Sequence, residues 1–114
     1  MSASRGAAAR QAAPLFAALG DPTRLGLVHR LSTEGALSIT RLSEGSGMTR
    51  QAITRHLYAL GQAGLVQDRK EGREHVFSLD LKRLEVARRY LDDVSAQWDA
   101  AAARLKVFVE NDER

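Results

Sequence analysis

The segment from Thr49 to Ala63 carries side chains that suit contact with nucleic acid. A helix over this segment, at 100° per residue, separates a polar face from an apolar face. The apolar face holds Ile53, His56, Leu57 and Leu60, and the polar face holds Arg50, Gln51, Thr54, Arg55 and Tyr58. Guanidinium groups bind phosphates and guanine, a carboxamide pairs with adenine, and threonine offers a hydroxyl and a methyl group. The segment contains no Asp or Glu, which phosphates would repel. We therefore interpret the polar face as a surface that reads DNA.

Two helices are expected to position this face, and together they predict a helix-turn-helix over residues 38–62. A short helix capped by Ser38 precedes Gly45-Ser46-Gly47, where two glycines in three residues indicate a tight turn. Thr49 then caps the longer helix, which runs to about residue 62. Ser38 and Thr49, at the starts of the two helices, join the expected DNA-contacting residues.

Residues 65–79 predict a β-hairpin beside the longer helix. Leu65-Val66 starts a strand, residues 68–73 are typical of a turn, and the second strand alternates through His75, Phe77 and Leu79. A hairpin after a DNA-reading helix is a wing, and its tip carries Arg69, Lys70 and Arg73. We expect these three side chains to contact phosphates. The alternative is a solubilising turn, in which such residues are ordinary.

Two further helices are expected before this unit. Residues 7–19 predict an Ala-rich helix after a frayed end, and Gly20 terminates it. Asp21-Pro22 opens the next helix, because Asp is a good N-cap and Pro is favoured at the first helical position. Their apolar residues at helical spacing are Leu15, Phe16 and Leu19 in the first and Leu25, Val28 and Leu31 in the second.

Residues 81–109 predict a long helix whose apolar residues recur every 3.5 residues. The repeat consists of Leu84, Ala87, Leu91, Val94, Trp98, Ala101, Leu105 and Phe108. Such a helix spans about 43 Å, too long for so small a domain to cover alone. We expect its first part to pack on Leu15, Phe16 and Leu19 and the remainder on a second copy, so that these residues form a homodimer interface. The alternative is a stripe buried wholly within one chain.

Composition restricts the class of protein. The chain has 114 residues, 17 Lys and Arg against 14 Asp and Glu, and no cysteine. This length favours one domain over residues 1–114, and the lack of cysteine excludes disulfides, thiolate metal sites and cysteine nucleophiles. No apolar run reaches the roughly 18 residues of a membrane span, and the N-terminus has no signal-peptide core. We therefore predict a cytoplasmic protein with no membrane partner.

Charge is divided unevenly along the chain. Residues 1–91 hold 14 basic and 8 acidic side chains, whereas residues 92–114 hold 3 basic and 6 acidic ones. Clustered positive charge is typical of nucleic-acid binding, although a mixed solvated surface is the alternative interpretation.

Several strings in the sequence resemble those of a known family. They are Leu15-Phe16-Ala17-Ala18-Leu19-Gly20-Asp21-Pro22-Thr23-Arg24-Leu25, Ile53-Thr54-Arg55-His56-Leu57, Leu60, Ala63-Gly64-Leu65-Val66 and Gly72-Arg73. In type and order they are similar to the arsenical-resistance-regulator (ArsR) family, from about residue 12 to residue 105. The resemblance implies a mainly α fold with a small β-hairpin, a winged helix-turn-helix with long N- and C-terminal dimerisation helices. It also implies a homodimer that binds operator DNA as a repressor and is released by a signal.

The sequence departs from the metal-sensing members of that family. Those members have two cysteines near the start of the first helix of the helix-turn-helix, where this chain has Ser38 and Thr40. Others bind zinc or nickel between C-terminal helices through His and carboxylates, whereas this helix has Asp92, Asp93 and Asp99 but no His. We therefore predict no metal ligands and no cofactor, and leave open a carboxylate site for a hard cation at the dimer interface.

The predicted function is sequence-specific DNA binding by a homodimeric repressor at a dyad-symmetric operator in double-stranded DNA. The alternative is an adaptor that keeps the winged-helix and coiled-coil shape but binds protein instead of DNA; the acid-free polar face disfavours it. No enzyme is expected, because Gly45-Ser46-Gly47 lacks the rest of a P-loop and neighbouring Asp92 and Asp93 point about 100° apart. The sequence does not identify the operator, the regulated genes or the inducer, which could be a small molecule or a protein. It also does not distinguish a repressor from an activator.

Overall fold

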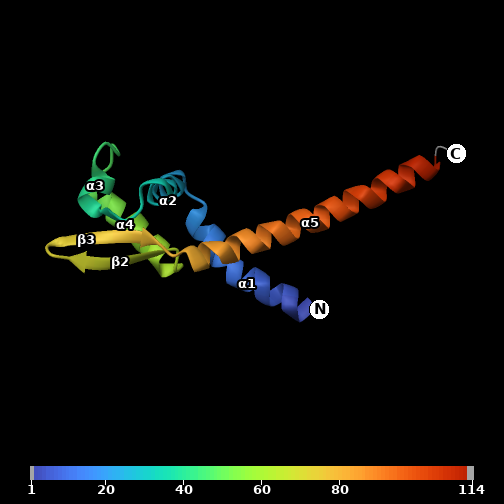
Figure 1. Ribbon diagram of the computed structural model, residues 1–114, viewed down its shortest axis with the longest axis horizontal. Coiled ribbons are helices and arrows are strands. Elements are labelled where there is room, and N and C mark those ends of the chain that lie inside the picture. The colour runs from blue at the N-terminus through green and yellow to red at the C-terminus, as the bar shows by residue number, and fades with distance from the viewer. Residues whose placement is uncertain (1, 113–114) are drawn as a thin grey trace.

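The chain folds into a helical head with a hairpin on one side and a long helix that projects from the other. The computed structural model describes residues 2–112, with side chains described from residue 6, and measures 71 × 31 × 20 Å (Figure 1). Its elements are α1 (Ser2–Leu19), α2 (Pro22–Glu34), β1 (Leu37–Ser38), α3 (Ile39–Ser43), α4 (Arg50–Gln62), β2 (Val66–Glu71), β3 (Glu74–Leu79) and α5 (Leu81–Asp112). This order confirms the predicted fold class, a mainly helical winged helix-turn-helix with a small β-sheet and a long C-terminal helix.

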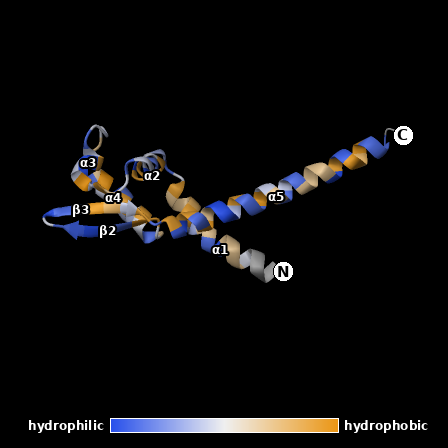
Figure 2. Ribbon diagram, in the orientation of Figure 1, coloured by the Kyte–Doolittle hydropathy of each residue, from blue (hydrophilic) through white to orange (hydrophobic). Residues whose placement is uncertain are grey.

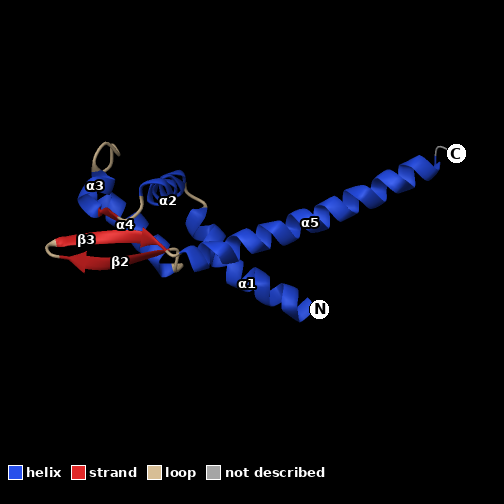
Figure 3. Cartoon of the chain, in the orientation of Figure 1, coloured by secondary structure: helices blue, strands red, loops and turns tan. Residues whose placement is uncertain are grey.

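The sheet has three antiparallel strands in the order β1-β3-β2 (Figure 3). Strand β1 was not predicted from the sequence, since two residues are too few to show the alternation that predicts a strand. Leu37 pairs with Phe77 and Ser38 with Val76, so β1 ties the start of the helix-turn-helix to the wing. The predicted turn over residues 68–73 was too long, because β2 and β3 stay paired up to Glu71 and Glu74.

Side-chain oxygens begin four of the helices by accepting backbone N–H groups of the first turn. Asp21 Oδ2 accepts from Arg24 at 3.1 Å at the start of α2, and Thr49 Oγ1 accepts from Ala52 at 3.0 Å at the start of α4. Ser38 Oγ caps α3 and Asp80 Oδ1 caps α5 in the same way, each at 3.1 Å. Caps are local, which explains why the starts of α2 and α4 could be predicted from sequence.

The core lies where the C-terminal half of α1, α2, α3, α4, the sheet and the start of α5 meet. Its most completely buried side chains are Leu15, Leu42, Ile53, Leu57, Leu60 and Leu65. The predicted stripe on α2 was wrong for Leu25, which is exposed, whereas Leu27 and Leu31 are buried one helical turn apart. Figure 2 shows apolar residues gathered in this head and recurring along α5 out to its far end.

The two terminal helices are longer than predicted. The N-terminal helix begins at Ser2 rather than at residue 7, so the expected frayed end is helical from its second residue, and α5 continues to Asp112 rather than residue 109. At the N-terminal end the helix includes Gly6, so this glycine does not break it, and at the C-terminal end no glycine or proline follows Phe108 up to Asp112. Helix α1 crosses the first turns of α5, and the rest of α5 projects away from the head (Figure 1).

Among residues 2–112, no helix is both long enough and apolar enough to cross a membrane.

Candidate nucleic-acid interface

Helix α4 divides into the two faces that the sequence predicts. Its inner face buries Ile53, Leu57 and Leu60 in the core. Its outer face exposes Arg50, Gln51, Thr54, Arg55 and Tyr58. Thr54 Oγ1 donates to the carbonyl oxygen of Arg50 at 2.7 Å. The helix therefore presents two guanidinium groups, an amide and two hydroxyls to solvent on one side.

The turn before α4 sets the position of that helix. Gly45 and Gly47 have φ values of +69° and +72°, a region that residues with a Cβ rarely adopt. Between them, Ser46 Oγ donates to Ser43 O at 2.8 Å and accepts from the Met48 N–H at 3.0 Å. This turn confirms the predicted glycine-containing connection between the two helices.

His56 connects the inner edge of α4 to the junction between α1 and α2. Its Nδ1 accepts from Arg24 Nη1 at 3.3 Å and lies 3.8 Å from Asp21 Oδ2. The Nε of Arg24 in turn donates to the carbonyl oxygen of Ala18, at the end of α1. The backbone N–H of Arg24 holds the pKa of Asp21 below its usual value, with a further contribution from the nearby positive charge of Arg24. His56 thus forms a hydrogen bond at the inner edge of α4, and its neighbours Asp21 and Arg24 both come from the Asp21-Pro22-Thr23-Arg24 string.

Ser38 and Thr40 lie at the base of the site and are occupied with structural contacts. Ser38 is half-buried and uses its hydroxyl to cap α3. Thr40 Oγ1 accepts from Arg50 Nη1 at 3.4 Å and donates to Glu74 Oε1 at 3.4 Å. Thr40 thereby links α3, α4 and β3 and orients the first arginine of the outer face.

The tip of the wing carries fewer available cations than the sequence implies. Arg69 pairs with Glu71 at 2.9 Å, because alternate residues of a strand share one face. Lys70 and Arg73 are exposed and form no ion pair within the part of the chain that the structure describes. Gly72, with a φ of +61°, makes the tight turn between the strands. The wing therefore offers Lys70 and Arg73 as its freely available positive charges.

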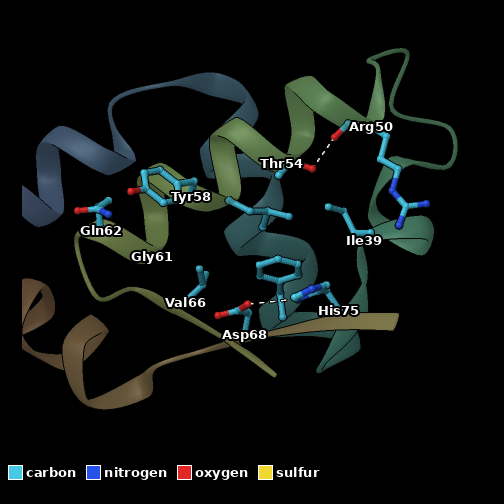
Figure 4. Close-up of a pocket in the computed structure, with 11 residues that line it drawn as sticks. Ile39, Arg50, Thr54, Tyr58, Gly61, Gln62, Val66, Asp68 and His75 are labelled. Carbon is cyan, nitrogen blue, oxygen red and sulfur yellow. Dashed lines mark hydrogen bonds and ion pairs between the residues drawn. The ribbon is translucent and has the colours of Figure 1, made fainter. Parts of the chain in front are cut away.

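A cavity of about 510 Å³ lies between α4 and the wing (Figure 4). Its lining residues are Ile39, Arg50, Thr54, Leu57, Tyr58, Gly61, Gln62, Val66, Asp68, His75 and Phe77. On the wing side, His75 Nδ1 lies 3.3 Å from Asp68 Oδ2. This cavity could not be predicted from the sequence, since its walls come from α3, α4 and two strands and no local pattern connects them.

The predicted dimerisation residues occupy three environments. Leu15 and Ala87 are buried in the core of their own chain, and Phe16, Leu19 and Leu84 pack against that core. Ala101 is partly exposed, and the exposed residues are Leu91, Val94, Trp98, Leu105 and Phe108. Phe16 also contacts Tyr90, with ring centroids 6.0 Å apart, a contact that the heptad pattern did not include. Only the second half of the stripe therefore has surface to offer to another molecule.

Asp92, Asp93 and Asp99 lie exposed along α5. Within residues 2–112 no group of three or more His, Asp or Glu side chains is placed to hold a metal ion.

Comparison with known proteins agrees with this architecture. Residues 19–69 match a family described as a helix-turn-helix domain. The arsenical resistance operon repressor of Escherichia coli K12 is 32% identical over 97 residues, which cover 85% of this chain and 80% of the repressor.

Two solved structures extend the similarity to the arrangement of the elements. An ArsR-like transcriptional regulator from Rhodococcus sp. RHA1 superposes with a TM-score of 0.74 and 34% identity, covering 87% of this chain and 92% of that one. A homodimeric winged helix-turn-helix DNA-binding domain from Mycobacterium bovis, a possible ArsR-family regulator, gives a TM-score of 0.64 and 28% identity, covering 82% and 84%. Sequence and structure together show that the chain belongs to the ArsR family of DNA-binding winged helix-turn-helix transcriptional regulators.

Proposed function

We propose that the protein is a homodimeric repressor that binds a dyad-symmetric operator through α4 and the wing. The observation that carries the proposal is the outer face of α4, which exposes Arg50, Arg55 and three neutral polar side chains and contains no carboxylate. The named function of the Escherichia coli relative, an operon repressor, supports repression rather than activation.

In this proposal the outer face of α4 enters the major groove. Gln51 and Thr54 are placed to contact base edges, to which Arg50 or Arg55 can add a contact, while the exposed cations, both arginines included, mainly neutralise phosphates. Thr49 and Tyr58 lie at the two ends of the same face and add hydroxyl groups to it. Lys70 and Arg73 contact the phosphate backbone of the DNA beside the wing, whereas Arg69 can do so only after its ion pair with Glu71 breaks.

The second copy is proposed to bind along the exposed half of α5. Exposure of the stripe begins at Leu91, four residues after the buried Ala87, and Trp98 and Phe108 are 74% and 69% exposed. Apolar side chains of this size are rarely left in water in a contiguous row. Two copies would bury both rows at once and place two α4 helices on one DNA duplex.

The exposed stripe is symmetric about a point between Asp99 and Ala100. Residues at equal distance from this point are Leu91 and Phe108, Val94 and Leu105, and Trp98 and Ala101. If a second α5 helix packs antiparallel with its twofold axis at this point, each residue lies opposite the other member of its pair. The large side chain of Trp98 then faces the small side chain of Ala101 of the second copy. A parallel partner would instead stack Trp98 on Trp98. We therefore propose an antiparallel α5 pair with its twofold axis at this point.

Two copies of α4 related by such an axis require a DNA site with the same symmetry. Half-sites separated by one helical turn, or a multiple of it, would place both helices in major grooves on one side of the duplex. The freely available cations, Arg50, Arg55, Lys70 and Arg73, would then make up to about eight phosphate contacts per dimer.

Titration of the protein against labelled DNA from upstream of its own gene, at several salt concentrations, tests the proposal. Eight ionic contacts predict a slope of about −7 for the logarithm of the binding constant against the logarithm of salt concentration. A scrambled duplex of the same length is the control and should bind at least about a thousandfold more weakly. Equal binding to both duplexes, or an affinity that does not change with salt, would exclude sequence-specific DNA binding.

A further inference from the structure

The cavity between α4 and the wing has the size and lining of a small-molecule site. Its volume of about 510 Å³ lies within the range of sites that bury drug-sized organic ligands. Ile39, Leu57, Val66 and Phe77 give it apolar walls, which suit a flat aromatic body. Figure 4 shows Thr54 and Tyr58 on the helix side of this space and Asp68 and His75 on the wing side.

The charges around the cavity favour an anion in one orientation. The guanidinium group of Arg50 hydrogen-bonds to the neutral hydroxyl of Thr40 and has no carboxylate partner within the described part of the chain. On the wing side, the carboxylate of Asp68 is already beside His75. An anionic group would therefore be attracted to Arg50 and would be directed away from Asp68.

The same cavity shares side chains with the surface proposed to read DNA. Arg50, Thr54 and Tyr58 line the cavity and also belong to the outer face of α4. A ligand whose anionic group occupies Arg50 takes the place of a DNA phosphate there. Ligand and DNA would then exclude each other, and a ligand that binds only the DNA-free protein lowers its apparent affinity for DNA.

We propose that this cavity binds a small aromatic anion and that the bound anion releases the protein from DNA. The binding site itself stands on the cavity and its charges, whereas the release step rests on the proposed function. In this proposal the releasing ligand binds between α4 and the wing, at a site that contains neither thiolates nor the acidic residues of α5.

Gly61 offers a way to fill the cavity without removing any proposed DNA contact. It lies in α4 and lines the cavity, and a Cβ built on it meets its nearest neighbours, Cγ2 and O of Val66, at 3.9 Å, which is ordinary contact. In Gly61→Leu the longer side chain would occupy space between α4 and β2. Gly26→Leu is the matched control, because Gly26 also lies in a helix and has no atom within 4 Å of its Cβ position.

The test uses 8-anilinonaphthalene-1-sulfonate, an aromatic anion whose fluorescence rises in apolar sites. Wild type and Gly26→Leu are expected to bind the dye with equal affinity, and Gly61→Leu at least about tenfold more weakly. Since all three proteins have the same α5 stripe, any dye bound there contributes equally to each and cancels in the comparison. At a dye concentration ten times the wild-type dissociation constant, the apparent affinity of wild type for operator DNA should fall about tenfold, and that of Gly61→Leu should fall by no more than about twofold.

Dye binding that is the same in Gly61→Leu and Gly26→Leu would overturn the site, and dye that binds in the cavity without weakening DNA binding would overturn the release step. Methyl resonances of wild type provide a readout that does not depend on the variant. Dye should shift the signals of Ile39, Leu57 and Val66 more than those of Leu91 and Leu105, and the reverse order would place the dye on α5. If wild type bound no DNA at all, the proposed function would fail while the dye and methyl measurements still decided the binding site.

Discussion

The Nη1 atom of Arg24 donates to Nδ1 of His56 at 3.3 Å and thereby connects the start of α2 to α4. The two residues are 32 positions apart in the sequence. Asp21 lies beside the pair and caps α2, so one small network holds the α1–α2 junction, α2 and α4 in register. We therefore expect this network to set the orientation of α4 in the domain, although none of its members lies on the outer face of that helix.

Replacing His56 by alanine should therefore affect both stability and DNA binding. Loss of one partly buried hydrogen bond is expected to lower the free energy of unfolding by about 1 kcal/mol. The affinity for operator DNA should fall because α4 is less firmly held. Urea denaturation and a DNA titration measure the two effects, with His29→Ala, at an exposed position of α2, as the control. A variant that matches His29→Ala in both measurements would show that the network does not position α4.

Replacing Arg50 and Arg55 together by alanine should remove four of the proposed phosphate contacts per dimer. The magnitude of the salt slope of DNA binding should become smaller by about 3 to 4 units, because a protein that neutralises fewer phosphates displaces fewer counterions from the DNA. Dimerisation should be unchanged, since neither residue lies on α5. Arg10→Ala, at an exposed position of α1, provides a charge-loss control. An unchanged salt slope in the double variant would indicate that the outer face of α4 does not bind DNA.

The antiparallel register of α5 can be tested by disulfide crosslinking, because the chain contains no cysteine of its own. Val94→Cys and Leu105→Cys should each stay monomeric on a denaturing gel when oxidised alone. Mixed before oxidation, the two variants should form a covalent dimer, because the proposed register places residue 94 opposite residue 105. Ala96→Cys mixed with Ala103→Cys is the matched control, with the same symmetry but away from the stripe.

A covalent dimer of either variant alone would instead indicate a parallel pair. Absence of any crosslink in the mixture, in a sample that is dimeric by ultracentrifugation, would show that the twofold axis lies elsewhere.

Thr49 caps α4, so Thr49→Ala should destabilise the protein by about 1 kcal/mol. Thr49→Ser keeps the capping oxygen and should restore most of the loss, which urea denaturation would measure. If both variants lose the same stability, the hydroxyl does not act as the cap.

The cap of α2 should act in a pH-dependent way. The pKa of Asp21 is held below its usual value, chiefly by the N–H of Arg24. The contribution of Asp21 to stability is therefore present above the unfolded pKa and is lost as pH falls through the folded pKa. The stability difference between wild type and Asp21→Asn should thus be constant near neutral pH and shrink below about pH 4. Thermal unfolding at a series of pH values measures it; a difference that grows on acidification would contradict the assigned cause.

Local features of the sequence predicted most of the fold. The helix starts at Asp21 and Thr49 could be predicted because a cap involves only the next three residues. The inner face of α4 could be predicted from the spacing of Ile53 and Leu57 alone. Contacts between distant segments could not be predicted. The partner of His56 lies 32 residues away, the pairing of Arg69 with Glu71 depends on a strand that extends further than its composition indicates, and β1 is visible only through Phe77 and Val76.

The same distinction applies to the site. The outer face of α4 could be identified from one helical repeat, whereas the cavity requires Ile39, Gly61 and Phe77 to be brought together by the fold. The apolar repeat on α5 predicted a row of side chains, but which of them stay exposed depends on where α1 crosses, as the burial of Ala87 and the exposure of Leu91 show.

Footprinting of the protein on DNA from upstream of its gene tests the central claim most directly. Two copies of α4 related by a twofold axis predict two protected segments of inverted sequence, centred about one helical turn or a multiple of it apart, with one dimer bound per site. A single protected segment without symmetry, one chain bound per site, or no protection of any duplex would contradict the proposal of a homodimeric operator-binding repressor.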